Sequence, residues 1–140
     1  MALFPETMPR PEPNMDDAEF WQNCAARRLA FQSCGDCGAF RHPPMPVCPA
    51  CHSTAVKWVD APETATVYSF TVVHYPSHPA VREVLPYVVA AVVFDGIDGV
   101  KFVTNITDGP SENVHVGMTV RLWWDDIGEG MHLPRFRPAP

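Results

Sequence analysis

Four of the five cysteines in this 140-residue chain stand in two pairs, and each pair is separated by two residues. The spacing is Cys34-x2-Cys37-x10-Cys48-x2-Cys51. A turn of this kind places two sulfurs on one side of an ion, and two such turns supply the four thiolates that a structural zinc ion prefers. Because protein ligands fill all four positions, we expect one zinc ion that stabilises the fold and takes no part in chemistry.

Other uses of cysteine fit the pattern less well. A thioredoxin-like redox pair normally has one CxxC at the start of a helix, whereas here two pairs have proline-rich flanks. An iron centre of the rubredoxin type has the same four ligands, so the sequence alone leaves zinc and iron open. The fifth cysteine, Cys24, falls on the apolar face of a predicted helix, with no histidine or acidic residue beside it on that face. We therefore expect a small buried residue and not a catalytic thiol.

The chain divides by composition into four segments. Residues 1–15 contain four of the 16 prolines and are expected to form an extended arm that becomes ordered only against a partner. Residues 16–30 hold a predicted helix over about 16–28, in which Asp16 and Glu19 have the spacing of a capping box. Residues 31–56 form the cysteine ribbon, and residues 57–140 form a barrel domain with a C-terminal tail.

The barrel is predicted from short runs of β-branched and aromatic residues that have little helix between them. These runs lie at residues 64–74, 86–94, 100–106 and 119–124. The second of them, PYVVAAVVF, is apolar on both faces. Four or five strands over this length indicate a mainly β fold built on a small barrel.

Charge and hydropathy narrow the classes of function. The formal net charge is −6 and only two lysines occur, whereas a protein that grips nucleic acid by its phosphates needs a basic face. No apolar run reaches the length of about 18 residues needed to span a membrane, and the first residues do not have the pattern of a secretion signal. We therefore expect a cytoplasmic protein that binds neither nucleic acid nor a membrane.

Histidines and other residues outside the ribbon offer weaker candidates. His74 and His78 bracket a polar loop that could form a site, but neither has a paired carboxylate or cysteine in the sequence. His52 either orients the second cysteine turn or is a solvated turn residue, and both remain open. The arginines near the C-terminus, Arg135 among them, are expected on a solvated surface.

The order of helix, four-cysteine ribbon and small barrel resembles the acyl-CoA-associated zinc-ribbon/OB-fold family over roughly residues 16–138. Two turns depart from the family pattern, since His52 stands where members usually carry glycine, and residues 61–64 replace a glycine-rich entry to the barrel. The matching stretches are Phe20-Trp21, RLAFQSCGDCGAFRHPPMPVCPAC, TVYSFTVVH, LPYVVAAVVFDG, VKFVTNIT, VHVGMTVRLWW and LPRFRP.

This resemblance implies a rubredoxin-like zinc ribbon followed by a five-stranded OB-fold barrel. It also implies a non-catalytic accessory subunit of a thiolase, acyltransferase or thiolase-like retro-aldol lyase that acts on acyl-CoA thioesters, steroid side-chain intermediates among them. Some members of the family accompany hydratase-like enzymes instead. The expected assembly is a heterotetramer with two copies of each chain, in which the partner binds most of the substrate.

The expected docking surfaces are Phe20, Trp21 and the proline-rich arm. Two alternatives from other functional classes stay open. One is a single-stranded nucleic-acid-binding OB-fold protein, although the acidic charge opposes it. The other is a stand-alone protein that binds acyl-CoA, or an enzyme that uses His74 or His78.

Overall fold

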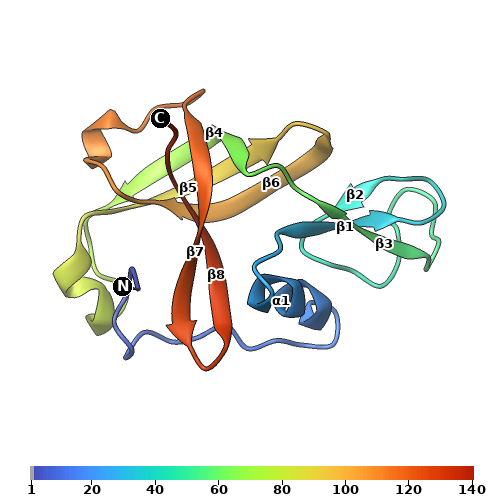
Figure 1. Ribbon diagram of the computed structural model, residues 1–140, viewed down its shortest axis with the longest axis horizontal. Helices are drawn as coiled ribbons and strands as arrows, with labels where there is room; N and C mark the ends of the chain where they lie inside the picture. The colour runs from blue at the N-terminus through green and yellow to red at the C-terminus, as the bar shows by residue number, and fades with distance from the viewer. Residues whose placement is uncertain (1) are drawn as a thin grey trace.

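A three-stranded sheet and a closed five-stranded barrel make up most of the fold (Figure 1). The computed structural model describes residues 2–140. The strand order is β2-β1-β3 in the sheet and β4-β5-β6-β8-β7 in the barrel. The mainly β fold, the ribbon and the five-stranded barrel that the sequence predicts are therefore confirmed. The strands are β1 (Ala30–Cys34), β2 (Phe40–Arg41), β3 (Val56–Asp60), β4 (Thr64–Val73), β5 (Tyr87–Phe94), β6 (Ile97–Ile106), β7 (Thr119–Gly128) and β8 (Met131–Pro138).

The barrel strands show the alternation of buried and exposed side chains that a barrel wall requires. Every second residue of β5 is buried, and β6 alternates in the same way over most of its length. The barrel closes where β4 pairs with β7 and where β6 meets β8 in parallel at Ile106 and Phe136. Phe136 has no exposed surface, so this last strand supplies a side chain to the barrel core.

The fifth barrel strand comes from the residues that the sequence analysis treats as a C-terminal tail. β8 forms a hairpin with β7 that runs from Gly128 and Met131 to Val120 and Pro138. Prolines in this segment hide its strand pattern, because proline cannot donate a ladder hydrogen bond. β8 shares only one registered ladder pair with β6, so most of that side lacks the regular ladder that proline would interrupt.

Helix α1 (Ala18–Ala25) is shorter than the predicted range of about 16–28. It ends early because Arg27 adopts a left-handed φ of 58°, and the N–H of Arg28 donates to the carbonyl of Asn23 over 2.8 Å. This turn lets the chain start β1 only a few residues later. Within residues 2–140 no helix is long and apolar enough to cross a membrane. Two short 3-10 helices, η1 (Pro79–Val84) and η2 (Ser111–Asn113), lie in barrel loops.

The start of α1 also differs from the prediction. The N-cap residue is Asp17 and its side chain makes no capping hydrogen bond, so the capping box of Asp16 and Glu19 does not form. The side chain of Asn14 replaces it: Oδ1 accepts hydrogen bonds from the N–H groups of Asp16 (2.8 Å) and Asp17 (3.0 Å). An upstream Asx turn therefore starts the helix.

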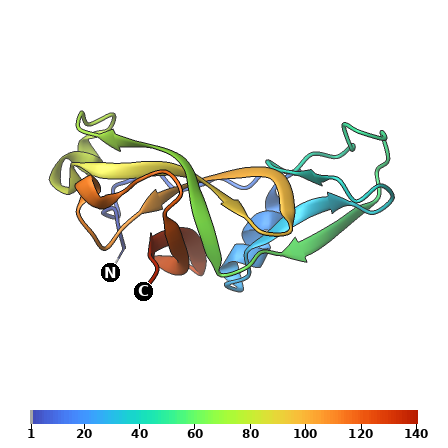
Figure 2. The ribbon, with the colours of Figure 1, turned by 90° about the horizontal axis from the view of Figure 1, so that it is seen from above.

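Aromatic side chains join the ribbon, the helix and the barrel in one core, although the ribbon projects from one end of the molecule (Figure 2). Phe31 of β1 is fully buried, and its ring lies 5.3 Å from Phe94 and 5.5 Å from Phe102 of the barrel. Phe20 of α1 packs on the same rings, and so does His42, whose pKa burial lowers to about 4. Burying each phenylalanine contributes roughly 1.5–3 kcal/mol, which holds the ribbon firmly against the barrel.

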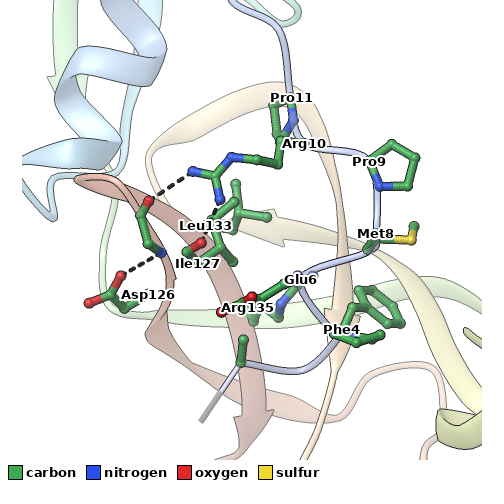
Figure 3. Close-up of a pocket in the computed structure, with 13 residues that line it drawn as sticks. Phe4, Glu6, Met8, Pro9, Arg10, Pro11, Asp126, Ile127, Leu133 and Arg135 are labelled. Atoms are coloured by element: carbon green, nitrogen blue, oxygen red, sulfur yellow. Dashed lines mark hydrogen bonds between the residues drawn. The ribbon is translucent and has the colours of Figure 1, made fainter. Parts of the chain in front are cut away.

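The N-terminal arm, residues 2–15, lies against the chain's own barrel. The N–H of Leu3 donates to Asp125 Oδ2 over 3.1 Å. The guanidinium of Arg10 donates to the carbonyls of Ile127 (2.5 Å) and Gly128 (2.8 Å) at the end of β7 (Figure 3). The arm therefore contacts the chain's own barrel, and its ordering against a partner stays a prediction.

Candidate metal centre and the groove beside the helix

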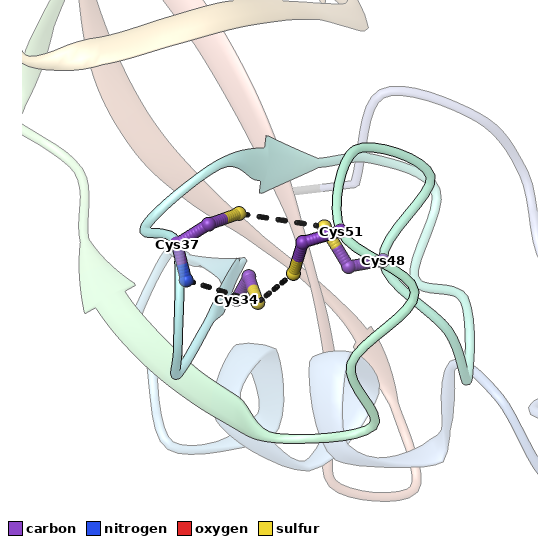
Figure 4. A group of neighbouring side chains, drawn as sticks. All are labelled: Cys34, Cys37, Cys48 and Cys51. Carbon is purple, nitrogen blue, oxygen red and sulfur yellow. Dashed lines mark hydrogen bonds between the residues drawn. The ribbon is translucent and has the colours of Figure 1, made fainter.

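The four ribbon cysteines meet at one point in space (Figure 4). Their sulfur atoms all lie within 4.8 Å of one another, and the Sγ–Sγ distance is 3.6 Å both for Cys34 with Cys51 and for Cys37 with Cys48. A tetrahedral zinc ion with Zn–S bonds of about 2.3 Å separates its sulfurs by about 3.8 Å. The cluster therefore has the size and the chemistry of a four-thiolate zinc site.

Equivalent backbone turns present the two pairs of sulfurs. The N–H of Gly38 donates to the carbonyl of Cys34 over 3.0 Å, and the N–H of His52 donates to the carbonyl of Cys48 over 2.9 Å. Both donors have left-handed backbones, with φ of 79° at Gly38 and 64° at His52. Glycine adopts this conformation without strain, whereas histidine does so at a small cost.

Gly35 has a different role from Gly38. A Cβ atom at Gly35 would lie 2.9 Å from the Cβ of Ala55, so any larger residue would push the first cysteine turn away from the end of the ribbon. Ser53 joins the same region, because its hydroxyl donates to Asp36 and its backbone carbonyl accepts from the N–H of Cys48. Close packing of these segments places the two cysteine turns opposite each other.

Hydrogen bonds prepare part of the cluster for ionisation. The N–H groups of Cys37 and Asp36 donate to Cys34 Sγ, each over 3.4 Å, and lower the pKa of Cys34 to about 6. The N–H of Cys51 likewise lowers the pKa of Cys48. The N–H of Ser53 acts in the same direction on Cys51, but the neighbouring thiols raise the pKa of Cys51 to about 12. Four thiols in contact cannot all ionise alone, so a cation is needed to hold the full thiolate set.

The loop histidines do not form a catalytic pair in the structure. His78 Nδ1 accepts a hydrogen bond from the N–H of Ala80 over 3.1 Å, so His78 caps the 3-10 helix η1. His74 and Tyr75 are exposed. Among the described residues, no carboxylate or thiol hydrogen-bonds to the imidazole of His74 or His78, so the arrangement offers neither an activated nucleophile nor a positioned base.

Trp21 and Phe20 have different surroundings, although they are adjacent in α1. Phe20 is 4% exposed and belongs to the core, whereas Trp21 is partly exposed. Trp21 lines a groove of about 480 Å³ between α1, the ribbon and the barrel, with Pro43, Pro44 and Tyr87 among the other wall residues. Phe20 also lines this groove, but Trp21 is the more exposed of the two residues predicted to dock a partner, and their docking role stays a prediction.

Arg135, which lines this groove, belongs to a buried ion pair that sequence reasoning missed. Arg135 is 7% exposed, and its Nε donates to Asp125 Oδ2 over 2.6 Å while Nη1 donates to Asn105 Oδ1 over 2.5 Å. The expectation that Arg135 lies on a solvated surface is therefore wrong. The tail-like composition around it hid the strand that turns this side chain inward. Arg135 also lines a second cavity, of about 610 Å³, beneath the N-terminal arm (Figure 3).

Comparison with protein families matches the two halves of the chain to two domain models. Residues 21–57 match the model described as "ChsH2, rubredoxin-like zinc ribbon domain". Residues 58–125 match the model described as "ChsH2, C-terminal OB-fold domain". Together with the sulfur geometry, the first match confirms the predicted site for one zinc ion.

Two curated relatives align with nearly all of the chain. One is the "probable enoyl-CoA hydratase alpha subunit" of Thermomonospora curvata, which is 41% identical over 94% of this chain. The other is the "3-oxo-4,17-pregnadiene-20-carboxyl-CoA hydratase alpha subunit" of Mycobacterium tuberculosis, which is 33% identical over 89% of this chain. The matched regions are 40% and 39% of those proteins, so this chain spans well under half the length of either.

Solved structures give matches of similar length. A structure described as "Ltp2-ChsH2(DUF35) aldolase" superposes with a TM-score of 0.84 and 40% sequence identity, and the match covers 94% of this chain and 100% of that chain. A protein of unknown function from the DUF35 family of Sulfolobus solfataricus superposes with a TM-score of 0.61 and 18% identity, over 86% of this chain and 83% of that one. The second likeness bears on the fold alone.

Proposed function

Because this chain belongs to the ChsH2 family of zinc-ribbon and OB-fold proteins, we propose that it is a non-catalytic accessory subunit of a thiolase-like enzyme acting on acyl-CoA thioesters. The observation that carries the proposal is the likeness, along the full length of the matched chain, to a component of the structure described as an Ltp2-ChsH2 aldolase. Steroid side-chain CoA thioesters are a reasonable substrate class, since one relative is named for a pregnadiene-carboxyl-CoA.

The chemistry of the described residues supports a non-catalytic role. Cys24, the cysteine outside the ribbon, is 1% exposed, and burial raises its pKa to about 12, so its thiol is neither ionised nor accessible. His78 is occupied as a helix cap, and His74 stands alone on the surface. The four remaining thiols are committed to the metal centre. The partner would therefore supply the nucleophile and the base.

The groove lined by Trp21 is the best candidate for the docking surface. It combines an aromatic residue with two prolines at the junction of helix, ribbon and barrel, and residues of the aromatic core form part of its mainly apolar wall. Tryptophan is among the residues that most often anchor protein interfaces. In this proposal the partner buries Trp21, and the assembly contains two copies of each chain.

Co-purification tests the proposal directly. The tagged chain is co-expressed with a thiolase-like subunit encoded near it, and the mass of the complex is measured by light scattering after size-exclusion chromatography. We expect a 2+2 complex that Trp21→Ser weakens at least tenfold. The matched control, Tyr75→Ser, removes an aromatic residue that is 83% exposed and does not line the groove, and it should leave the complex intact. Failure to co-elute with any thiolase-like subunit would refute the accessory role.

A second candidate partner is a hydratase, because both curated relatives are named as hydratase alpha subunits. More than half of each relative lies outside the matched region, so the hydratase chemistry can reside there or in a further subunit. The same co-expression experiment with a hydratase-like subunit distinguishes a thiolase-like partner from a hydratase partner. Stable co-elution with the hydratase subunit, and none with the thiolase-like one, would favour the second.

A further inference from the structure

Arg41, in the short strand β2, is a buried cation without a counter-charge. Its side chain is 4% exposed, and its Nε donates to the carbonyl of Met45 over 3.0 Å. Both terminal nitrogens, Nη1 and Nη2, are shielded from solvent and have no hydrogen-bond partner within residues 2–140. None of the salt bridges of the described chain includes Arg41. A buried guanidinium left in this state is strongly unfavourable unless some other negative charge compensates it.

The other buried arginine shows what normal compensation looks like in this protein. Arg135 is buried to a similar extent, but its guanidinium is bonded to the carboxylate of Asp125 and to the amide oxygen of Asn105. Arg41 has no such carboxylate. The contrast indicates that the negative charge facing Arg41 is not an acidic side chain.

The side chains next to Arg41 in the ribbon sheet offer it hydrogen-bond donors but no free hydrogen-bond acceptor. Gln32 of β1 stands directly opposite Arg41, and Trp58 of β3 stands opposite Gln32 on the other side, so the three share one face. The Oε1 atom of Gln32 already accepts from the N–H of Met45, and the indole Nε1 of Trp58 is buried without a partner. This face of the ribbon therefore has an excess of positive potential.

The metal centre lies on that same face. Cys34 follows Gln32 by two residues in β1, so its side chain emerges on the side that carries Arg41 and is diagonal to it. Cβ atoms of diagonal neighbours in an antiparallel pair lie about 7–8 Å apart. Four thiolates with one divalent ion form a doubly negative centre, and this is the charge that the ribbon otherwise leaves uncompensated.

We propose that Arg41 is the counter-charge of the metal centre, and that it biases the ribbon toward a divalent ion. Four thiolates carry a net charge of −2 with a divalent ion and −1 with ferric iron. The positive charge of Arg41 stabilises the doubly negative centre more than the singly negative one. If the charges lie on the order of 8 Å apart, the spacing of diagonal Cβ atoms, and the effective dielectric constant is about 20, one unit of charge difference corresponds to at least a tenfold change in an equilibrium constant. Arg41 thus favours zinc over an iron centre that cycles between two oxidation states. The proposal does not depend on the identity of the partner enzyme.

The test compares Arg41→Met, Arg41→Lys and wild type in the purified full-length chain. Zinc release to an excess of a chelating dye is followed by absorbance. We expect Arg41→Met to release zinc at least tenfold faster than wild type, and Arg41→Lys to stay within about threefold of wild type. Arg28→Gln is the matched control, because it removes an exposed arginine close to the ribbon and should release zinc at the wild-type rate.

Two further readouts separate charge from shape. Without metal, Arg41→Met should unfold no more easily than wild type, because it removes an uncompensated buried charge. With iron bound in place of zinc, the iron centre of Arg41→Met should have a lower reduction potential than that of wild type. The iron centre of Arg41→Lys should retain the wild-type potential. The proposal is overturned if Arg41→Met keeps the wild-type release rate and potential, or if Arg41→Lys and Arg41→Met change both equally. In the latter case the shape or hydrogen bonding of arginine would matter, and its charge would not.

Discussion

Replacing Asp125 with asparagine should destabilise the barrel severely, because the change leaves Arg135 buried without its counter-charge. Asp125 is fully buried, and its Oδ2 accepts hydrogen bonds from Arg135 Nε (2.6 Å) and from the N–H of Leu3 (3.1 Å). Two charges about 4 Å apart attract each other by about 4 kcal/mol at an effective dielectric constant near 20. Breaking one partner of a buried pair typically costs about 3–5 kcal/mol. Both estimates give a decrease of about 4 kcal/mol in the free energy of unfolding. For a chain of this length, that corresponds to a fall in Tm of roughly 10 °C or more.

The assay is urea unfolding of the zinc-saturated protein, monitored by tryptophan fluorescence. The double variant Asp125→Leu with Arg135→Met removes both charges and should lie within about 1.5 kcal/mol of wild type, because it leaves no uncompensated ion. Glu63→Gln is the control, because Glu63 pairs with Arg121 at the surface and should contribute less than about 1 kcal/mol. A loss below 1 kcal/mol for Asp125→Asn, or a double variant no more stable than the single one, would refute the reasoning.

Three further predictions follow from individual residues of the ribbon and core. Burial raises the pKa of Cys24 to about 12, and the other four thiols are committed to the metal centre. A thiol reagent at pH 8 should therefore modify no cysteine of the folded zinc-loaded protein, and all five after denaturation with a chelator. One fast-reacting thiol in the native state would contradict this. Burial lowers the pKa of His42 to about 4, so the stability that neutral His42 provides is present above pH 6.5 and is lost as the pH falls toward 4. Compared with His42→Phe, wild type should lose up to about 3 kcal/mol over that range in urea unfolding, and parallel curves for the two proteins would count against it. His52→Gly should raise the free energy of unfolding by about 0.5–1 kcal/mol, because glycine adopts the left-handed φ of this position without strain; a less stable variant would show that the imidazole has a supporting role.

Local patterns in the sequence were enough to predict the ribbon and most of the barrel. The cysteine spacing indicates the metal centre, because a CxxC turn is a local structure whose geometry depends on neighbouring residues. The four strand-like runs are recognisable by residue type, and each corresponds to a strand of the barrel. Cys24 is buried as its place on the apolar helix face predicts.

Predictions that depended on long-range contacts succeeded less often. The helix ends early because a turn must deliver β1 to the sheet, and that requirement arises from the pairing of β1 with β3 far along the chain. Phe20 and Trp21 are equally apolar in the sequence, yet only the packing of Phe31 and Phe102 decides that Phe20 is inside. No local signal distinguishes the two.

The sequence by itself determined that this chain binds a structural metal ion and continues into a small barrel, because both follow from short-range spacing and residue type. Only the tertiary structure decided the environment of its charges. The sequence predicts a surface position for Arg135, but β8 closes the barrel and turns this side chain toward Asp125. Nothing in the sequence distinguishes Arg41, and only the fold of the ribbon buries it on the face of the cysteines. The physical reason is that the cost of a buried charge depends on which groups the fold brings near it, and those groups come from distant parts of the chain.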